Sequence, residues 1–408
     1  MGDDTAKTET GSAILPGFCA VGGAPDGPCA WPALHEALDT VWGPSGRLDL
    51  ETADSVSREE DRHPDVAIWG GETHSLNRLS KILSRARKKG LDIPLLIAGP
   101  LPNEASGRLR PVAYLAPECP AERLAERLRD VVREAVRLEE ARLRRRCLGG
   151  RGARTGRQGE DPGASCDRLL VVGLSDRVAG ALRAQGRGID LVGALTADTA
   201  LAELDRGGIV GAVLDAPVSR IEDVLAQIRR DPRHATLPVL AIATTVASAE
   251  RLWLAGASDV AIAGLEPEAL AARLRPLLLA GARRKLTRHV LARDRAAHLS
   301  GETAVPRDRF DAYLAALTGV LAARGQSPVQ RPLASFHPGP MAAHVANDPD
   351  LTAAIGDPVR SAALAASREE DFIATVEGLG DIAVLRGQAA ADRLSRRIAG
   401  IVGATSFG

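Results

Sequence analysis

Short apolar runs alternate with amphipathic segments between residues 168 and 280. The runs RLLVVG, LVGAL, GAVLDA, LPVLAIAT and DVAIAG have the length and composition of buried strands, and a segment with helical spacing of apolar residues follows each of them. Five strands that are each followed by a helix predict a parallel sheet with helices on both faces. The flavodoxin-like doubly wound sheet is the natural arrangement for such a segment.

The same alternation of predicted strands and helices precedes this segment in a less regular form. VAIWG (66–70), PLLIAG (94–99) and PVAYLA (111–116) predict strands, and helical spacing is found at 75–90 and 121–146. The number of residues from one predicted strand to the next resembles that of the later segment. We therefore interpret the N-terminal region as a degenerate copy of the same fold.

A third segment has a different order of elements. Helical spacing predicts helices at 309–325, 358–367 and 389–402, and apolar runs predict a strand at 331–336 and a hairpin at 372–385. A strand, a helix, a hairpin and a helix in succession indicate an α+β domain rather than a third parallel sheet.

These patterns divide the chain into two α/β domains and an α+β domain. We expect a disordered tail at 1–12, a first domain at 13–147, a second at 167–283 and a third at 284–408. Residues 148–166 are rich in glycine and charge, and they predict a flexible linker.

Composition excludes several classes of partner. The formal net charge is zero, which argues against nucleic acid or an anionic membrane as the partner, and the basic clusters at 141–147 and 282–288 are interpreted as solvated helix faces. The sequence contains no apolar run of the roughly 18 residues that span a bilayer, and its polar N-terminus does not resemble a signal peptide. The five cysteines show no metal-ligand spacing. A cytoplasmic protein without membrane insertion is expected.

Residues 168–280 resemble the receiver domain of two-component response regulators over their whole length. In that family a phosphate-accepting aspartate follows the third strand, and a Thr or Ser follows the fourth. Asp215 stands at the first of these positions, and Thr244 and Thr245 stand at the second.

The other functional positions of the receiver family are changed. Gly173 and Leu174 stand where receivers carry an acidic pair for Mg²⁺, and Ala263 and Gly264 replace the Lys-Pro after the fifth strand. In the first domain the aspartate position is Gly70. Without a metal, a lone carboxylate lacks the charge that stabilises phosphoryl transfer. We interpret both domains as CheY-like pseudo-receivers with a vestigial phosphoacceptor.

The order of receiver, receiver and α+β domain resembles the PleD-type response regulators, which end in a GGDEF diguanylate cyclase domain. In active members the carboxylates of the GG(D/E)EF turn bind metal ions. The corresponding turn here consists of Glu377, Gly378, Leu379, Gly380 and Asp381. Ser335 and His337 stand where the family has strand aspartates, and its final strand and helix are not found. The resemblance implies a degenerate, C-terminally shortened domain that is not an enzyme, with no catalytic or metal-binding residues.

An Arg-x-x-Asp motif remains at Arg368 and Asp371. In the family such a motif lies five residues before the turn and binds cyclic di-GMP as a product-inhibition site, and FIATV supplies those five residues here. The same pattern also occurs at 127–130, 187–190 and 220–223. Position alone distinguishes the fourth copy, whose alternative interpretation is a charged cluster at a helix end.

The chemistry of the motif suits a guanine nucleotide. An arginine matches guanine O6 and N7 with two donors, and a carboxylate accepts from the guanine N1–H and amine. The family also uses secondary arginines, and Arg324 matches the position of one of them. Arg187, or Arg183, of the second receiver would supply another across the domain interface.

Within this family the chain is most similar to the PopA-like cyclic di-GMP effectors, which act at a cell pole as adaptors. This resemblance implies a cyclic di-GMP ligand, no other cofactor, and protein partners of the protease-adaptor and cell-cycle-regulator type for ClpXP-type proteolysis. Receivers commonly pair through their last helix and strands, so a homodimer is also implied. Two alternatives stay open: a weak cyclase regulated by phosphorylation of Asp215, and a scaffold that binds no nucleotide.

Overall fold

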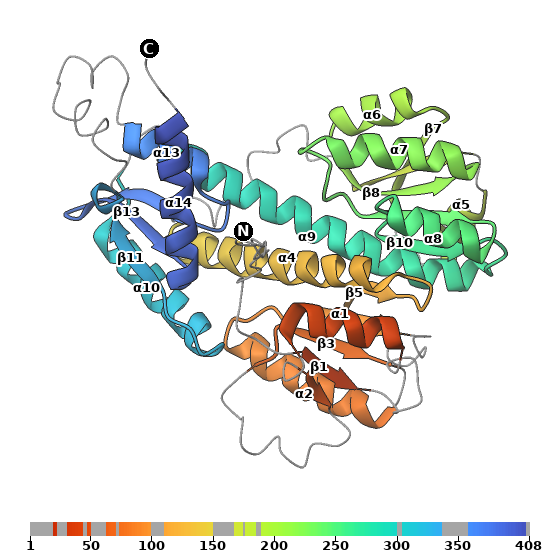
Figure 1. The fold of residues 1–408 in the computed structure, drawn as a ribbon, viewed down its shortest axis with the longest axis horizontal. Coiled ribbons are helices and arrows are strands. Elements are labelled where there is room, and N and C mark those ends of the chain that lie inside the picture. Colours follow the sequence, from red (N-terminus) through yellow and green to blue (C-terminus); the bar gives the residue numbers. More distant parts are fainter. Residues whose placement is uncertain are drawn as a thin grey trace, which may run out of the picture.

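The computed structural model describes residues 19–22, 31–43, 47–49, 63–70, 73–98, 110–149, 167–173, 176–184, 189–299, 304–336 and 358–404. Two α/β domains lie side by side, and a smaller third domain lies at the far end of two long helices, α4 (Ala121–Cys147) and α9 (Pro267–Leu299) (Figure 1). Within the described residues, no helix combines the length and the apolar character needed to cross a bilayer.

The first domain is a parallel sheet in the order β2-β1-β3-β4-β5. Its strands are β1 (Cys19–Gly22), β2 (Arg47–Asp49), β3 (Val66–Trp69), β4 (Leu95–Ala98) and β5 (Pro111–Leu115). Its helices are α1 (Pro32–Trp42), α2 (Thr73–Lys88) and α4 (Ala121–Cys147). This is the flavodoxin-like strand order, so the prediction that the first domain has the same fold as the second in a degenerate form is confirmed.

The second domain repeats this order as β10-β9-β8-β6-β7, again with parallel pairing. Its strands are β6 (Arg168–Gly173), β7 (Asp190–Ala194), β8 (Ile209–Asp215), β9 (Val239–Ala243) and β10 (Asp259–Ile262). Its helices are α5 (Asp176–Ala184), α6 (Ala197–Asp205), α7 (Val218–Arg230), α8 (Val246–Leu254) and α9 (Pro267–Leu299). The strands lie where the apolar runs predict them, and β8 and β9 are buried along nearly their whole length. The expectation of a buried strand is wrong for β7, which lies at the edge of the sheet and is mostly exposed.

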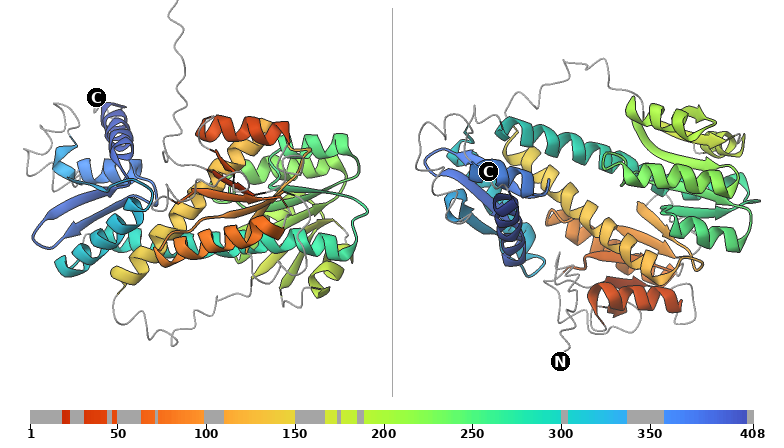
Figure 2. Two further views of the ribbon diagram at one scale, coloured as in Figure 1. Left: turned by 90° about the horizontal axis from the view of Figure 1, so that it is seen from below. Right: turned by 45° about the horizontal axis from the view of Figure 1, so that its top comes forward.

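Helices α4 and α9 extend beyond their own domains and lie side by side (Figures 1 and 2). Helix α4 ends at Cys147, where the sequence predicts the end of the first domain. The predicted boundary at residue 283 instead falls within α9, which continues without a break to Leu299. The two helices therefore connect the receivers to the third domain.

The two α/β domains pack against each other through their last elements. Helix α9 and strand β10 contact β5, and α9 packs along α4. Arg273 of α9 pairs with Asp259 at 2.8 Å, and its guanidinium lies over the ring of Tyr114, 5.6 Å from the centroid. The face on which the homodimer expectation rests is thus occupied within one chain, so a homodimer would have to use another face.

The third domain is an antiparallel sheet in the order β11-β13-β12 with helices on both faces. Its elements are α10 (Arg307–Ala322), β11 (Val329–Pro332), the 3₁₀ turn η4 (Leu333–Ser335), α13 (Pro358–Ala366), β12 (Phe372–Val376), β13 (Gly380–Leu385) and α14 (Gln388–Ala404). Phe372 packs with Phe310 and Tyr313 of α10, whereas Ile373 packs on the side of α13 and α14. The predicted α+β domain and its hairpin are confirmed.

Candidate functional site

The Arg-x-x-Asp tetrapeptide forms a tight turn between α13 and β12. The carboxylate of Asp371 accepts a hydrogen bond from the backbone N–H of Arg368 at 2.8 Å, and the N–H of Asp371 donates to the carbonyl of Arg368 at 3.1 Å. Burial raises the pKa of Asp371 to about 6, although the hydrogen bond from Arg368 opposes the shift. The aspartate therefore closes its own turn.

Two arginines fix the helix end from which this turn starts. Arg295 of α9 donates to the carbonyl of Leu364, and Arg397 of α14 donates to the carbonyl of Ala366 at 2.9 Å. Cationic donors suit the last carbonyls of a helix, because these groups have no partner within it and carry the negative end of the dipole. The position of the tetrapeptide is thus set by two neighbouring helices.

The two middle residues of the tetrapeptide bind helix α4. Glu369 pairs with Arg137. Glu370, whose side chain is buried, lies 3.8 Å from Arg133 and 3.9 Å from Arg368, measured between carboxylate oxygen and guanidinium nitrogen. The tetrapeptide is therefore attached to the helix that leaves the first receiver.

A cleft of about 710 Å³ opens beside the tetrapeptide. Its walls come from α4, from α9, from the second receiver and from the segment 367–370 of the third domain, so all three domains contribute. Arginines outnumber carboxylates more than twofold among the lining side chains, and Arg368 is one of them. Asp371 is not part of the lining, so the structure brings only the arginine of the predicted pair to the cleft.

Two lining arginines have neutral hydrogen-bond partners among the residues that the structure describes. Arg229 donates to the carbonyls of Gly256, Ala235 and Leu237 at 2.8–2.9 Å. Arg284 donates to the hydroxyl of Thr236 and to a backbone carbonyl. Burial, reinforced by neighbouring arginines, lowers the pKa of both guanidinium groups to about 10. The lining arginines outnumber the carboxylates, and the charges of Asp130, Glu134 and Glu369 only partly offset burial and the neighbouring arginines. An anion in the cleft would therefore be stabilised.

Arg324 is not among the residues of the cleft. Its side chain is 2% exposed, and it donates to Asp65 of the first receiver and to Glu139 of α4, each at 2.6 Å. Arg386 binds Glu139 and Glu140 from the other side at 3.2 and 3.1 Å. The predicted role of Arg324 as a secondary ligand finds no place in this geometry, because its donors serve a buried ion-pair network between domains. Arg187 lies outside the described residues.

The expectation of solvated basic faces is wrong for part of both clusters. Arg144 is 3% exposed and pairs with Glu140 at 2.8 Å and with Asp294 at 3.0 Å. Arg284 is buried, and Arg283 pairs with Asp92 of the first receiver. These side chains lie between domains, which single-helix periodicity does not reveal.

The receiver positions lack the groups for a metal site. Asp215 ends β8 and is half-buried. Gly173 has φ +106°, and a Cβ there would lie 1.9 Å from the carbonyl oxygen of Asp215. Thr245 caps α8, since its hydroxyl accepts from the N–H of Ser248 at 3.1 Å. Leu174 lies outside the described residues. The backbone itself excludes a side chain at the first acidic position.

Two glycines shape the hairpin turn between β12 and β13. Gly378 and Gly380 both have positive φ, +72° and +76°, as tight glycine turns allow. Asp381 accepts from the hydroxyl of Thr375 and lies 3.5 Å from Arg360, whereas Glu377 is exposed. Ser335 donates to the carbonyl of Pro332 at 2.7 Å, and His337 lies outside the described residues.

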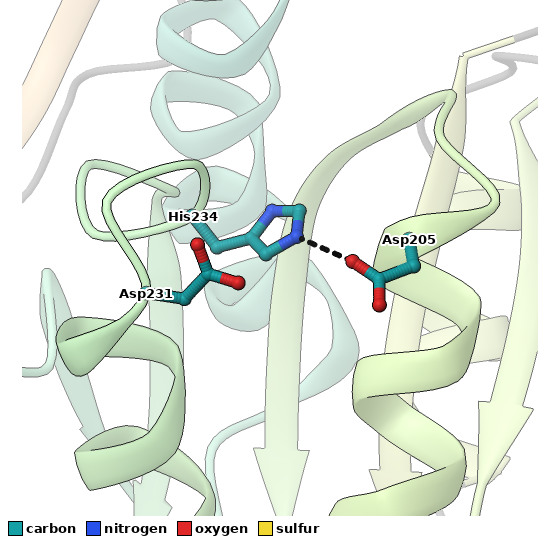
Figure 3. Close-up of side chains that lie close together, drawn as sticks. All are labelled: Asp205, Asp231 and His234. Carbon is teal, nitrogen blue, oxygen red and sulfur yellow. Dashed lines mark hydrogen bonds and ion pairs between the residues drawn. The ribbon is translucent and has the colours of Figure 1, made fainter.

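A second cluster of potential ligand atoms lies on the surface of the second receiver. Asp205, Asp231 and His234 approach one another within 4.8 Å (Figure 3), and His234 Nε2 lies 3.3 Å from Asp205. Arg233 pairs with both carboxylates, at 2.9 and 2.6 Å, and its hydrogen bonds lower the pKa of Asp231 to about 2. The guanidinium already supplies the positive charge that a metal ion would bring.

Comparisons with known proteins find response regulators. The chain is similar to a response regulator of Chloroflexus aurantiacus at 24% identity and a TM-score of 0.26. This match covers 28% of the present chain and 99% of the Chloroflexus chain. It is similar to chemotaxis protein CheY4 of Vibrio cholerae at 18% identity and a TM-score of 0.25, with 28% and 99% covered. For NtrX of Brucella abortus the identity is 24%, the TM-score 0.26, and the covered shares 33% and 30%. No protein-family model and no curated protein matches the chain. The receiver-like fold of both α/β domains rests on the strand orders described above.

Proposed function

We propose that this chain is a non-catalytic cyclic di-GMP effector of the response-regulator type, which binds the dinucleotide in the arginine-lined cleft at Arg368. The observation that supports this proposal is the position of Arg368. It lies at the edge of a cleft whose lining carries an excess of positive charge and to which all three domains contribute.

The cleft suits the chemistry of a cyclic dinucleotide. Its volume of about 710 Å³ lies within the range of small-molecule sites. The Arg368 guanidinium offers two parallel donors to guanine O6 and N7. Arg284 and Arg229 would provide positive charge for the two phosphates. Arg284 is buried and Arg229 is partly buried, which strengthens this electrostatic attraction.

A ligand in this cleft would contact both receivers and the third domain. Such a ligand favours the domain arrangement that completes its contacts, and so shifts the population of arrangements. We propose that the favoured arrangement presents a docking surface to protein partners. On this proposal the protein is an adaptor in regulated proteolysis. Its place of action would be a cell pole.

Calorimetry with cyclic di-GMP tests the proposal. Wild type is expected to bind, and Arg368→Ala to bind roughly 10- to 100-fold more weakly, because a bidentate arginine–guanine pair contributes about 1–3 kcal/mol. The matched control is Arg220→Ala, which removes an exposed arginine from another Arg-x-x-Asp sequence, on α7. Its affinity should equal that of wild type.

Two results would count against the effector function. Absence of binding by wild type would favour a scaffold without a nucleotide ligand. Formation of cyclic di-GMP from GTP and Mg²⁺ would favour a cyclase, which the loss of both turn carboxylates argues against. If such synthesis also rose on phosphorylation of Asp215, the enzyme alternative would stand.

A further inference from the structure

The cleft already contains an anion of the chain itself. The carboxylate of Glu369 binds Arg137 of α4, and both residues line the cleft. The side chain of Arg137 is 11% exposed, whereas that of Glu369 is 37% exposed. A buried cation is thus covered from the solvent side by a more accessible carboxylate.

Arg137 has a second carboxylate partner of a different kind. Its other terminal nitrogen pairs with Glu134, which lies three residues earlier on the same helix. Burial lowers the pKa of Arg137, but Glu134 and Glu369 outweigh this effect and raise it. The pair with Glu134 is local to α4 and persists in any arrangement of the domains, whereas the pair with Glu369 joins two domains.

An incoming phosphate and Glu369 compete for the same donors. Phosphate binds arginine in the same two-pronged way as a carboxylate, and both terminal nitrogens of Arg137 are occupied. Glu370 is less available for exchange, because its side chain is only 9% exposed and it serves Arg133 and Arg368 together. Glu369 is therefore the anion that can leave without exposing a buried charge.

We infer that Glu369 is a displaceable internal counter-anion: a phosphate group of the ligand takes its place on Arg137, and this exchange removes one of the two ion pairs that join the segment 367–371 to helix α4. The inference rests on the proposed cyclic di-GMP site and adds its regulation. Ligand binding must first break an interdomain ion pair, which lowers the affinity and links occupancy of the cleft to the position of the third domain.

Calorimetry with cyclic di-GMP on Glu369→Gln tests the displacement. The amide keeps the size of the side chain but removes the competing charge, so this variant is expected to bind about tenfold more tightly than wild type. Glu377→Gln is the matched control, because it removes the same charge from the exposed hairpin turn outside the cleft lining. Its affinity should stay within about twofold of wild type.

A second background separates displacement from a general charge effect. In Arg137→Gln the donor group is absent, so adding Glu369→Gln should give no further gain in affinity. A tenfold gain that persists in this background would overturn the displacement from Arg137. Equal affinity of wild type and Glu369→Gln would overturn the inference and leave the proposed function intact. Absence of binding in every variant would overturn the proposed function itself.

Discussion

At the scale of single residues, charge compensation separates two arginines that the sequence places in one site. Arg324 gives its donors to Asp65 and Glu139 and is 2% exposed. Arg368 lies 3.9 Å from the carboxylate of Glu370, and its side chain lines the cleft. A buried guanidinium that is held by two carboxylates is costly to release, so only the second arginine is available to a ligand.

Asp371 should make the stability of the third domain depend on pH. Its pKa is about 6 in the folded protein, against the ordinary aspartate value of 3.8 that applies to an unfolded chain. The folded state therefore binds this proton more tightly. The resulting contribution is fully present below about pH 4 and is lost as the pH rises through 6, with a magnitude of about 3 kcal/mol.

Urea unfolding of Asp371→Asn at pH 4.5 and pH 7 measures this contribution. The amide oxygen can still accept from the N–H of Arg368, so the turn should persist while the titration disappears. Wild type is expected to lose more stability than the variant between the two pH values. The same pH dependence in both proteins would contradict the raised pKa.

Gly173 should not tolerate a side chain, although the receiver family has a carboxylate there. A Cβ would lie 1.9 Å from the Asp215 carbonyl oxygen, and φ is +106°. Gly173→Ala is expected to cost about 3 kcal/mol or more in thermal or urea unfolding. Gly193→Ala in β7 is the control, because its Cβ meets no atom within 4 Å. An equal effect of the two changes would contradict this account.

At the scale of elements, the long helix α9 contacts two domains with its two halves. Its first half closes the second receiver, where Leu274 and Leu277 pack against the sheet. Its second half carries Arg283, Arg284 and Arg295 toward the cleft and the third domain. The boundary between domains is thus a change of partner along one helix, which explains why composition alone places it differently.

Close packing of α9 on β8 predicts opposite effects for two helical glycines. A Cβ at Gly281 would lie 1.7 Å from the carbonyl oxygen of Val210, whereas a Cβ at Gly400 of α14 meets nothing within 4 Å. Gly281→Ala should lower the free energy of unfolding by about 3 kcal/mol or more, which a lower unfolding midpoint would show. Gly400→Ala should stabilise by about 0.5–1 kcal/mol. A neutral result at Gly281 would show that α9 can shift away from the sheet.

At the scale of the whole molecule, the sequence predicts domains better than it predicts the site between them. The strands of the second receiver and the hairpin of the third domain follow from local apolar runs, and both are found. Arg137 and Arg284 belong to helices whose charge pattern looks solvated, and only tertiary packing brings them to the cleft. Glu139 likewise lies in a charged run, yet it is 1% exposed. Periodicity describes one element at a time, so it cannot reveal a charge that is buried by another domain.

The position of the third domain should depend on Glu139, which contributes nothing directly to the cleft. Its carboxylate binds both Arg324 and Arg386, and removing one partner of a buried ion pair costs about 3–5 kcal/mol. Glu139→Ala is therefore expected to speed amide hydrogen exchange in α10 and β13 and to weaken cyclic di-GMP binding, because the segment 367–370 forms one wall of the cleft. Glu122→Ala, an exposed change on the same helix, should alter neither measurement. If exchange in the third domain is the same in both variants, the buried network does not hold that domain in place, and the cleft must be maintained by the contacts of the tetrapeptide and of Arg295 with Leu364.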